Sequence, residues 1–313
     1  MALTSFGIRE KWLRMLIKVL PSHPDIFTSL TNKERMEEAQ YLLGGIGNKQ
    51  VPAIKDWGIG IGLIERYDSA NETKYSLTSL GKIIAQYDPQ FEEQGTLWTI
   101  HYNLCANSSK IKYTDKSDDI WFYSRYSNSF GAGTFSRNEI KACLKKYEKD
   151  GKNYSDSVIE KMCMASLLET MSNTKIGKEL GVMTIVDSEK NIYERRHPDE
   201  VSLHPAILAY MLYDWADFNS RPSMNTAEFY SNDSVACLMA IDEEQLRMYL
   251  NKIQDRYTKK ILWVSWTAGL NSVAFEKNIP SLAILRAYYI EHQVGKDPLK
   301  SLSEGIELER IKD

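Results

Sequence analysis

Residues 33–87 read KERMEEAQYLLGGIGNKQVPAIKDWGIGIGLIERYDSANETKYSLTSLGKIIAQY, and this stretch decides the fold that the sequence predicts. Apolar residues recur at helical spacing in its first two segments, from Met36 to Leu43 and from Val51 to Ile61. Two short strands, 65–67 and 74–77, then precede a third helix over 80–86. This order of helix, turn, helix and hairpin predicts a winged helix-turn-helix.

The turn between the first two helices is rich in residues that adopt positive φ angles easily, namely Gly44, Gly45 and Gly47. Asn48 is placed to cap the second helix, and Pro52 suits its first turn. Thr78 is placed to cap the third helix. Glycines weaken a helix interior, so we expect the second helix to end near Gly58.

In DNA-binding winged helices, the second helix of the pair enters the major groove and its first turns meet base edges. Here those turns carry side chains able to contact bases or phosphates: Asn48, Lys49, Gln50 and Lys55. Arg66 and Lys74 lie on the hairpin, where minor-groove or phosphate contacts are available. The sequence therefore predicts a DNA-binding surface. The alternative is a winged helix that serves only for packing or dimerisation.

The composition is that of a globular protein, with 313 residues, 43% hydrophobic content and a formal charge of -3. This charge argues against a protein wrapped uniformly on phosphate, so any nucleic-acid face must be local. We predict a mainly α fold with small β-hairpins. Its parts are the winged helix-turn-helix (1–87), a mostly helical middle domain (88–218) and an α+β C-terminal helix-hairpin-helix region (219–313).

Neither a metal-binding cysteine motif nor a membrane segment is evident. The cysteines lack C-x-x-C spacing, so buried reduced thiols are expected at Cys105, Cys143, Cys163 and Cys237. The first 20 residues mix charge into their apolar positions, unlike a signal peptide or a membrane span. We expect a cytoplasmic protein without a membrane partner.

Residues 9–20 form an amphipathic helix in which Trp12 and Leu16 share the apolar side. Its basic residues, Arg9, Arg14 and Lys18, could touch a DNA backbone. An ordinary solvated face is the alternative.

A further helix is predicted to begin at Asp88, with this residue as N-cap and Glu92 near the positive end of the helix dipole. His101 shares a face with Trp98 and Cys105, as a core histidine does. Glu92 and His101 would project to nearly opposite sides of one helix. A metal site that used His101 would need acids from another segment, such as 118–119.

The rest of the chain predicts helices over 137–152, 155–171, 204–218, 242–257 and 280–291. Hairpins are expected after residue 180 and around 269–271, a long loop over 221–233, and a frayed polar tail from Lys296. No P-loop, dinucleotide fingerprint, G-x-S-x-G elbow or H-E-x-x-H helix is present, so no nucleotide cofactor is expected.

Several segments, in order, resemble one bacterial family catalogued as a domain of unknown function: SFGIREKWL, LLGGIGNKQVPAIKDWGIGIGLIE, YSLTSLGKII, YDPQFEEQGTLWTIHYNL, WTAGLNSVAF and LAILRAYY. That family includes the SspB-like nicking component of Ssp-type DNA phosphorothioation systems, in which sulfur replaces a non-bridging phosphate oxygen. The likeness spans nearly the whole chain and is most specific over residues 40–105.

The resemblance implies a bacterial defence enzyme that nicks one DNA strand with Mg²⁺ or Mn²⁺, alongside other proteins of the phosphorothioation system. On this reading the catalytic residues are Asp88 and Glu92 as ligands, with His101 as base or in the shell behind them, although the capping and core roles explain each of these residues better. The alternatives are a non-catalytic DNA-binding adaptor or regulator, and a module that docks only to proteins.

Overall fold

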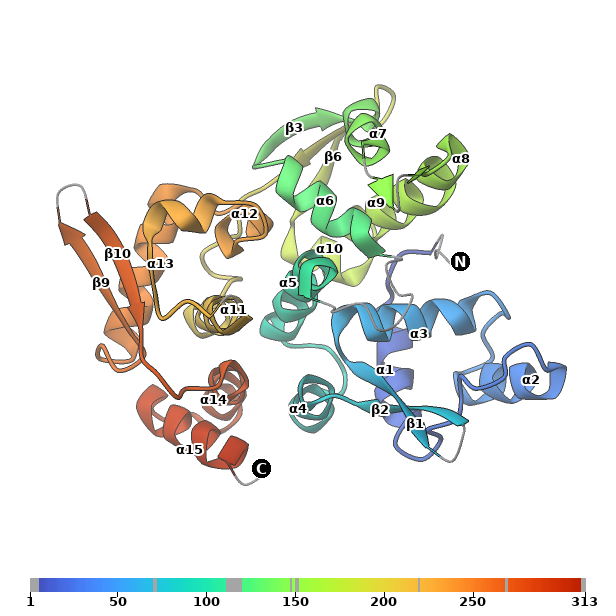
Figure 1. The fold of residues 1–313 in the computed structure, drawn as a ribbon, viewed down its shortest axis with the longest axis horizontal. Helices are drawn as coiled ribbons and strands as arrows, with labels where there is room; N and C mark the ends of the chain where they lie inside the picture. Colours follow the sequence, from blue (N-terminus) through green and yellow to red (C-terminus); the bar gives the residue numbers. More distant parts are fainter. Residues whose placement is uncertain are drawn as a thin grey trace. The chain divides into compact units, whose positions relative to one another are not determined.

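The structure is a computed structural model that describes residues 6–69, 72–110, 120–146, 148–149, 152–218, 220–267 and 270–310. The chain divides into two compact units, residues 1–196 and 197–313. The sequence placed boundaries after residues 87 and 218 instead, and these fall inside the first and second units. Both units are mainly helical with small antiparallel sheets, as the sequence predicts (Figure 1).

The first unit begins with helices and one hairpin, in the order α1 (Glu10–Val19), α2 (Lys33–Leu42), α3 (Gln50–Ile61), β1 (Ile64–Ser69), β2 (Glu72–Leu77) and α4 (Ser79–Tyr87). It continues with α5 (Gln94–Lys110), α6 (Trp121–Ser129), β3 (Gly133–Ser136), α7 (Arg137–Lys145), β4 (Glu148–Lys149) and β5 (Lys152–Asn153). It ends with α8 (Asp156–Val158), the π-helix η2 (Ile159–Met164), α9 (Ala165–Ser172), α10 (Lys175–Leu180), β6 (Met183–Asp187) and β7 (Ile192–Arg195).

Local caps fix the helix starts around the β1–β2 hairpin. The Asn32 side chain accepts hydrogen bonds from the backbone of Glu34 and Arg35 at the start of α2. Thr78 caps α4 by accepting from Gly81, as predicted. Asn48, by contrast, does not cap α3, because that helix has Lys49 in the N-cap position without a side-chain cap.

Helix α3 runs through its glycines to Ile61, so the predicted end near Gly58 is wrong. A Cβ at Gly58 would lie 2.6 Å from a methyl of Leu16, and one at Gly60 would lie 2.3 Å from Ile120 Cδ1. These glycines therefore let neighbouring side chains approach the helix, and this packing outweighs the propensity cost of about 1 kcal/mol for each glycine.

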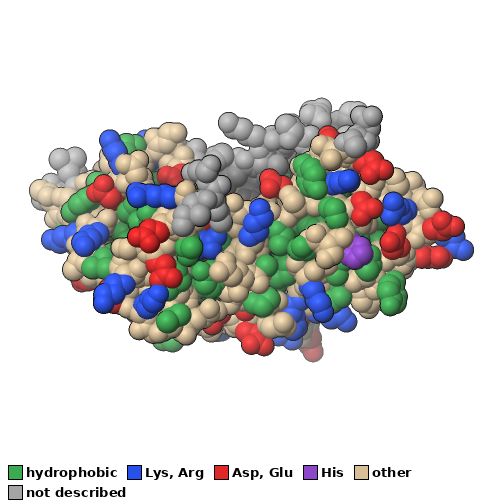
Figure 2. All heavy atoms as spheres, turned by 90° about the horizontal axis from the view of Figure 1, so that it is seen from below, with side chains coloured by type: hydrophobic (Ala, Val, Ile, Leu, Met, Phe, Trp, Pro, Cys, Tyr) green, Lys and Arg blue, Asp and Glu red, His purple; other side chains and the backbone are tan. Residues whose placement is uncertain are grey.

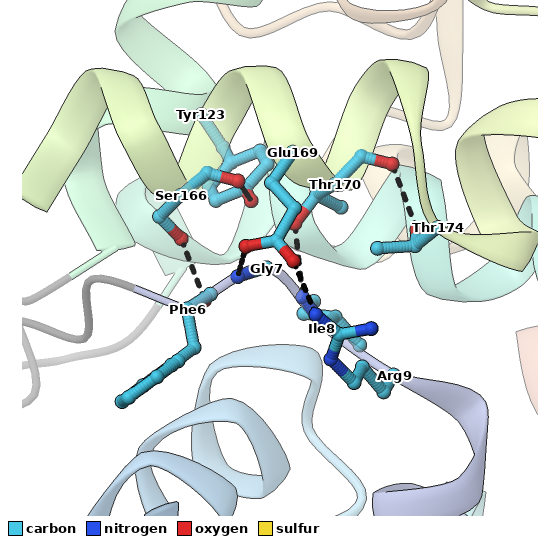
Figure 3. A network of polar contacts seen from close by, with 9 residues as sticks. All are labelled: Phe6, Gly7, Ile8, Arg9, Tyr123, Ser166, Glu169, Thr170 and Thr174. Atoms are coloured by element: carbon cyan, nitrogen blue, oxygen red, sulfur yellow. Dashed lines mark hydrogen bonds and ion pairs between the residues drawn. The ribbon is translucent and has the colours of Figure 1, made fainter. Parts of the chain in front are cut away.

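A polar latch joins the extended segment Phe6–Arg9 to helix α9 (Figure 3). Gly7 N donates to Glu169 Oε2 at 2.8 Å, and Ile8 N donates to Thr170 Oγ1 at 3.0 Å. Arg9 forms an ion pair with Glu169. A Cβ on Gly7 would lie 2.8 Å from Glu169 Cγ, so close approach of the backbone to α9 explains the glycine at this position.

Replacing Glu169 with alanine is expected to lower the free energy of unfolding by about 1–3 kcal/mol, because Gly7 N–H and Arg9 lose their shared acceptor. Urea denaturation followed by circular dichroism measures the change. The matched control is Glu179→Ala, since that exposed carboxylate only faces Lys175 at 3.8 Å. Equal midpoints for both variants would contradict a stabilising latch.

In the remainder of the first unit, α5 packs against α3, α6 and α10. Helices α8, η2 and α9 form the helical stretch that the sequence predicts over 155–171, with a π-helical section in its middle. The predicted hairpin after residue 180 is present as β6–β7, and β3 adds to it in the order β3-β7-β6. Cys105, Cys143 and Cys163 in this unit are buried and do not form disulfides.

The second unit contains α11 (Pro205–Phe218), β8 (Ser223–Asn225), the 3-10 helix η3 (Thr226–Tyr230), α12 (Val235–Met239), α13 (Glu243–Arg256), β9 (Leu262–Thr267), β10 (Leu270–Phe275), α14 (Ser281–Val294) and α15 (Pro298–Arg310). Its sheet has the order β8-β10-β9. The boundary predicted at 218 falls at the end of α11, which packs against α13 and α14.

Two predictions for the second unit are wrong. The expected loop over 221–233 contains β8 and η3, because Asn225 forms a capping box with Glu228. The expected frayed tail is helix α15, whose Gly305 lies so close to α14 that a Cβ would be 2.4 Å from Ala283 O. Leu302 is buried and Arg286 pairs with Glu309, so contacts with α14 hold a helix whose surface is mostly polar. Within the described residues, no helix has the length and apolarity needed to cross a membrane.

Candidate nucleic-acid interface

The predicted DNA-contacting residues at the start of α3 lie at the surface to different degrees. Asn48 and Lys49 are exposed, whereas Gln50 and Lys55 are half-buried. Gln50 Oε1 accepts from Gly47 N at 2.9 Å, and Lys55 Nζ lies 3.5 Å from Asp56 Oδ1. The turn before α3 therefore offers more accessible donors than the helix itself.

The body of α3 is buried between neighbouring helices. Most of its residues are inaccessible, including Val51, Ile54, Trp57 and Ile61, because the helix packs against both α1 and α5. Ala53, Gly58 and Gly60 are also buried, so apolar or small residues surround the helix on several sides. The half-buried residues of α3, such as Gln50, Lys55 and Ile59, leave only a narrow stripe of the helix partly accessible to a ligand.

Arg66 and Lys74 lie on opposite faces of the β1–β2 hairpin. Arg66 is paired with Tyr75 across the strands, whereas Lys74 is paired with Tyr67, so their side chains alternate. Tyr75 is buried against Phe27, with ring centroids 5.5 Å apart. The exposed Arg66 is held by Thr73 Oγ1 at 3.1 Å. A ligand that binds one face of the hairpin would therefore contact only one of these two cations directly.

A hollow of about 600 Å³ adjoins the turn between α2 and α3. Gly44, Gly45 and Gln50 line one side, and Gly44 and Gly45 have φ angles of 88° and 76°. Three cations, Arg9, Lys11 and Lys175, and one acid, Glu10, complete the charged lining. Sequence reasoning missed Lys11 and Lys175, because residues from three separate helices meet only in the folded chain.

Asp88 acts as a local cap, although α5 begins at Gln94 and not directly after Asp88 as predicted. Its carboxylate accepts from Glu92 N at 2.9 Å, Glu93 N at 3.0 Å and Thr96 Oγ1 at 2.6 Å. Between Asp88 and the start of α5 the chain makes an additional turn, in which Phe91 has a φ of 56° and is fully buried. Burial of the Phe91 ring explains why the helix starts later.

His101 is buried in α5 with its ring against Trp98, at a centroid distance of 5.8 Å. Burial, together with the positive charge of Arg195, lowers the pKa of His101 to about 3. Its Nδ1 is buried without a hydrogen-bond partner among the described residues. At neutral pH the ring is therefore uncharged and shielded from water.

The structure does not bring Asp88, Glu92 and His101 together. Glu92 is exposed, Asp88 is occupied by three donors, and His101 is in the core. Among the residues that the structure describes, no three His, Cys, Asp or Glu side chains are grouped to hold a metal ion. Residues 118–119 lie outside the described residues. The catalytic roles and the Mg²⁺ or Mn²⁺ requirement stay predictions, and these donors do not fit a shared ion.

Comparisons with known proteins agree on one family and one fold. The family model described as "Protein of unknown function (DUF4007)" matches residues 4–289. A structure described as "Magnesium ion-bound SspB crystal structure" is 17% identical, with a TM-score of 0.71 over 99% of this chain and 95% of that one. A second, "SspB crystal structure", is 15% identical, with a TM-score of 0.69 over 97% and 95%. No curated protein matches the sequence. At these identities the likeness establishes the fold.

Proposed function

This chain belongs to the DUF4007 family, and from that membership we propose that it is a DNA-binding component of a phosphorothioation system with an SspB-like role. One observation supports DNA binding most directly. The exposed Asn48 and Lys49 lie beside the hollow that Arg9, Lys11 and Lys175 line. They belong to the N-terminal part of the chain, which has the element order of a winged helix. Lysine and arginine contact phosphates, while asparagine and glutamine read base edges.

The charge distribution leaves room only for a local binding surface. Figure 2 shows Lys and Arg side chains interspersed with Asp and Glu on the face that it draws. With a net charge of -3, the chain as a whole does not attract a polyanion. DNA binding then depends on a few cations whose positions are fixed by the fold, and its affinity falls steeply with salt.

Nicking of one DNA strand is the second part of the proposal, and it rests on the family alone. A divalent metal would activate water and stabilise the leaving oxygen. We assign no chemical step to Asp88, Glu92 or His101, since they do not converge. A non-catalytic adaptor is the competing proposal: it binds duplex DNA but leaves supercoiled plasmid intact in Mg²⁺ or Mn²⁺, whereas a nickase converts the plasmid to open circles.

The combined change Lys49→Ala, Gln50→Ala and Lys55→Ala is expected to weaken duplex binding roughly 10- to 100-fold near 0.1 M salt, because two phosphate contacts and one polar contact are lost. Fluorescence anisotropy with a labelled duplex measures this affinity. The control, Lys190→Ala with Lys260→Ala, removes the same positive charge from exposed positions elsewhere. Unchanged affinity in the triple variant would remove the turn and α3 from the interface.

A further inference from the structure

A second hollow of about 630 Å³ lies beside α1, where Ala85 of α4 and Gln90 complete its lining, and Asn48, Lys49 and Lys55 do not contribute to it. Lys11, Arg14 and Lys18 contribute its charged lining, and no acidic residue lines it. The buried residues Ile17 and Leu43 lie at its base. The hollow therefore has an apolar base, and all of the charged side chains that line it are positive.

The cations follow one line along the helix, at i, i+3 and i+7. With a rise of 1.5 Å per residue, Lys11 and Lys18 are about 10 Å apart along the axis. One strand of DNA rises about 3.4 Å per nucleotide along the duplex axis, so a row laid parallel to that axis would pass about three nucleotides. Its spacing suits successive phosphates of one strand.

Two of the three cations are available to a ligand. Lys11 and Lys18 are exposed and form no ion pair with any described residue. Arg14 is oriented by Gln90 Oε1 at 3.2 Å and lies 3.7 Å from Glu10 Oε1. A ligand with negative charge would thus meet two mobile ammonium groups and one guanidinium held in place.

The two hollows share Lys11 and Gly44. Positive charge consequently continues from the α2–α3 turn along α1, through the residues that both linings have in common. A ligand that extends over both would need charges at regular intervals, as a nucleic-acid backbone has. A small phosphorylated molecule would fill only one of them.

We infer that the α1 row of Lys11, Arg14 and Lys18 holds the phosphate backbone of a DNA strand. This site deepens the proposed DNA-binding function and rests on it. It places the main backbone contacts on α1, outside the helix that the sequence assigns to base recognition. In this arrangement the α2–α3 turn reads the strand that α1 holds.

The test is the double charge reversal Lys11→Glu with Lys18→Glu in the full chain, compared with Lys190→Glu plus Lys260→Glu. Both pairs change the net charge equally and use exposed positions. We expect the α1 variant to bind a labelled duplex at least about 100-fold more weakly near 0.1 M salt, with a salt slope smaller by about two. The control pair should change affinity less than threefold. Lys11→Gln with Lys18→Gln, which adds no repulsion, should show the same loss of slope.

The outcomes that would overturn the inference can be told apart from one another. If the natural chain binds no DNA at low salt, the proposed function fails together with the site. If it binds DNA and only the turn variant weakens binding, the α1 site alone is wrong. Competition by tripolyphosphate at concentrations where a single strand does not compete would indicate a small phosphorylated ligand. Competition by polyglutamate as strong as that by DNA would indicate an acidic protein partner.

Discussion

Replacing Gly81 with alanine is expected to destabilise the first unit by about 3 kcal/mol, or roughly 6–12 °C in Tm for a unit of this size. A Cβ at this position would lie 2.1 Å from Leu63 O. That oxygen belongs to the backbone before β1 and accepts hydrogen bonds from Thr78 N at 3.0 Å and Thr78 Oγ1 at 3.3 Å. The neighbour is therefore a fixed atom, and a side-chain rotation cannot relieve the clash.

Thermal denaturation by circular dichroism, with calorimetry to resolve the two units, measures the effect. Gly131→Ala is the matched control, since nothing lies within 4 Å of a Cβ there and its φ is not positive. That variant should melt within about 1 °C of the natural chain. A Gly81→Ala variant that melts with the control would show that the hairpin and α4 can separate without cost.

The second large effect concerns pH. We expect His101→Leu to remove much of the acid sensitivity of the first unit between pH 6.5 and about 4.5; below that range carboxylates whose pKa is lowered, such as Glu139 and Glu160, also contribute. The folded-state pKa of His101 is lowered to about 3 from an ordinary 6.5 because the ring is buried and Arg195 is near. In this range the unfolded chain binds a proton that the folded chain does not, so stability is present above pH 6.5 and is lost as pH falls.

The slope from this one group is about 1.4 kcal/mol per pH unit at most. Urea midpoints of the natural chain and of His101→Leu, taken at each half pH unit, measure the difference. His23→Leu is the control, because that half-buried side chain lies outside the core. At neutral pH the leucine should cost little, since it also removes an unpaired buried Nδ1. If the urea midpoints of all three proteins fall equally steeply as the pH is lowered, His101 is protonated in the folded state.

Local sequence signals correctly predicted several individual elements within residues 10–87. The Thr78 cap, the hairpin and the apolar spacing of α1 to α3 depend on near neighbours in the chain, so a pattern of a few residues contains the information. The late start of α5 was not predictable in this way. It depends on Phe91, which is fully buried, and on Thr96, which donates to the Asp88 carboxylate.

The candidate site shows the same limit. Asn48 and Lys49 could be identified by their position before a helix, but Lys175 joins them only through tertiary packing. The glycines of α3 misled the prediction for a related reason. Propensity favours a helix end at Gly58, whereas the contacts with Leu16 and Ile120 that require glycine are invisible to local reasoning.

The latch between Gly7 and Glu169 has a bearing on how this chain is assembled. The two residues are 162 positions apart, so α1 lacks its anchor until nearly all of the first unit has left the ribosome. Native contacts of such high sequence separation form slowly and late. A fragment cut after the hairpin would retain the local signals of a winged helix without the partner that immobilises its first helix, and residues 1–196 are the smallest piece suited to dissection.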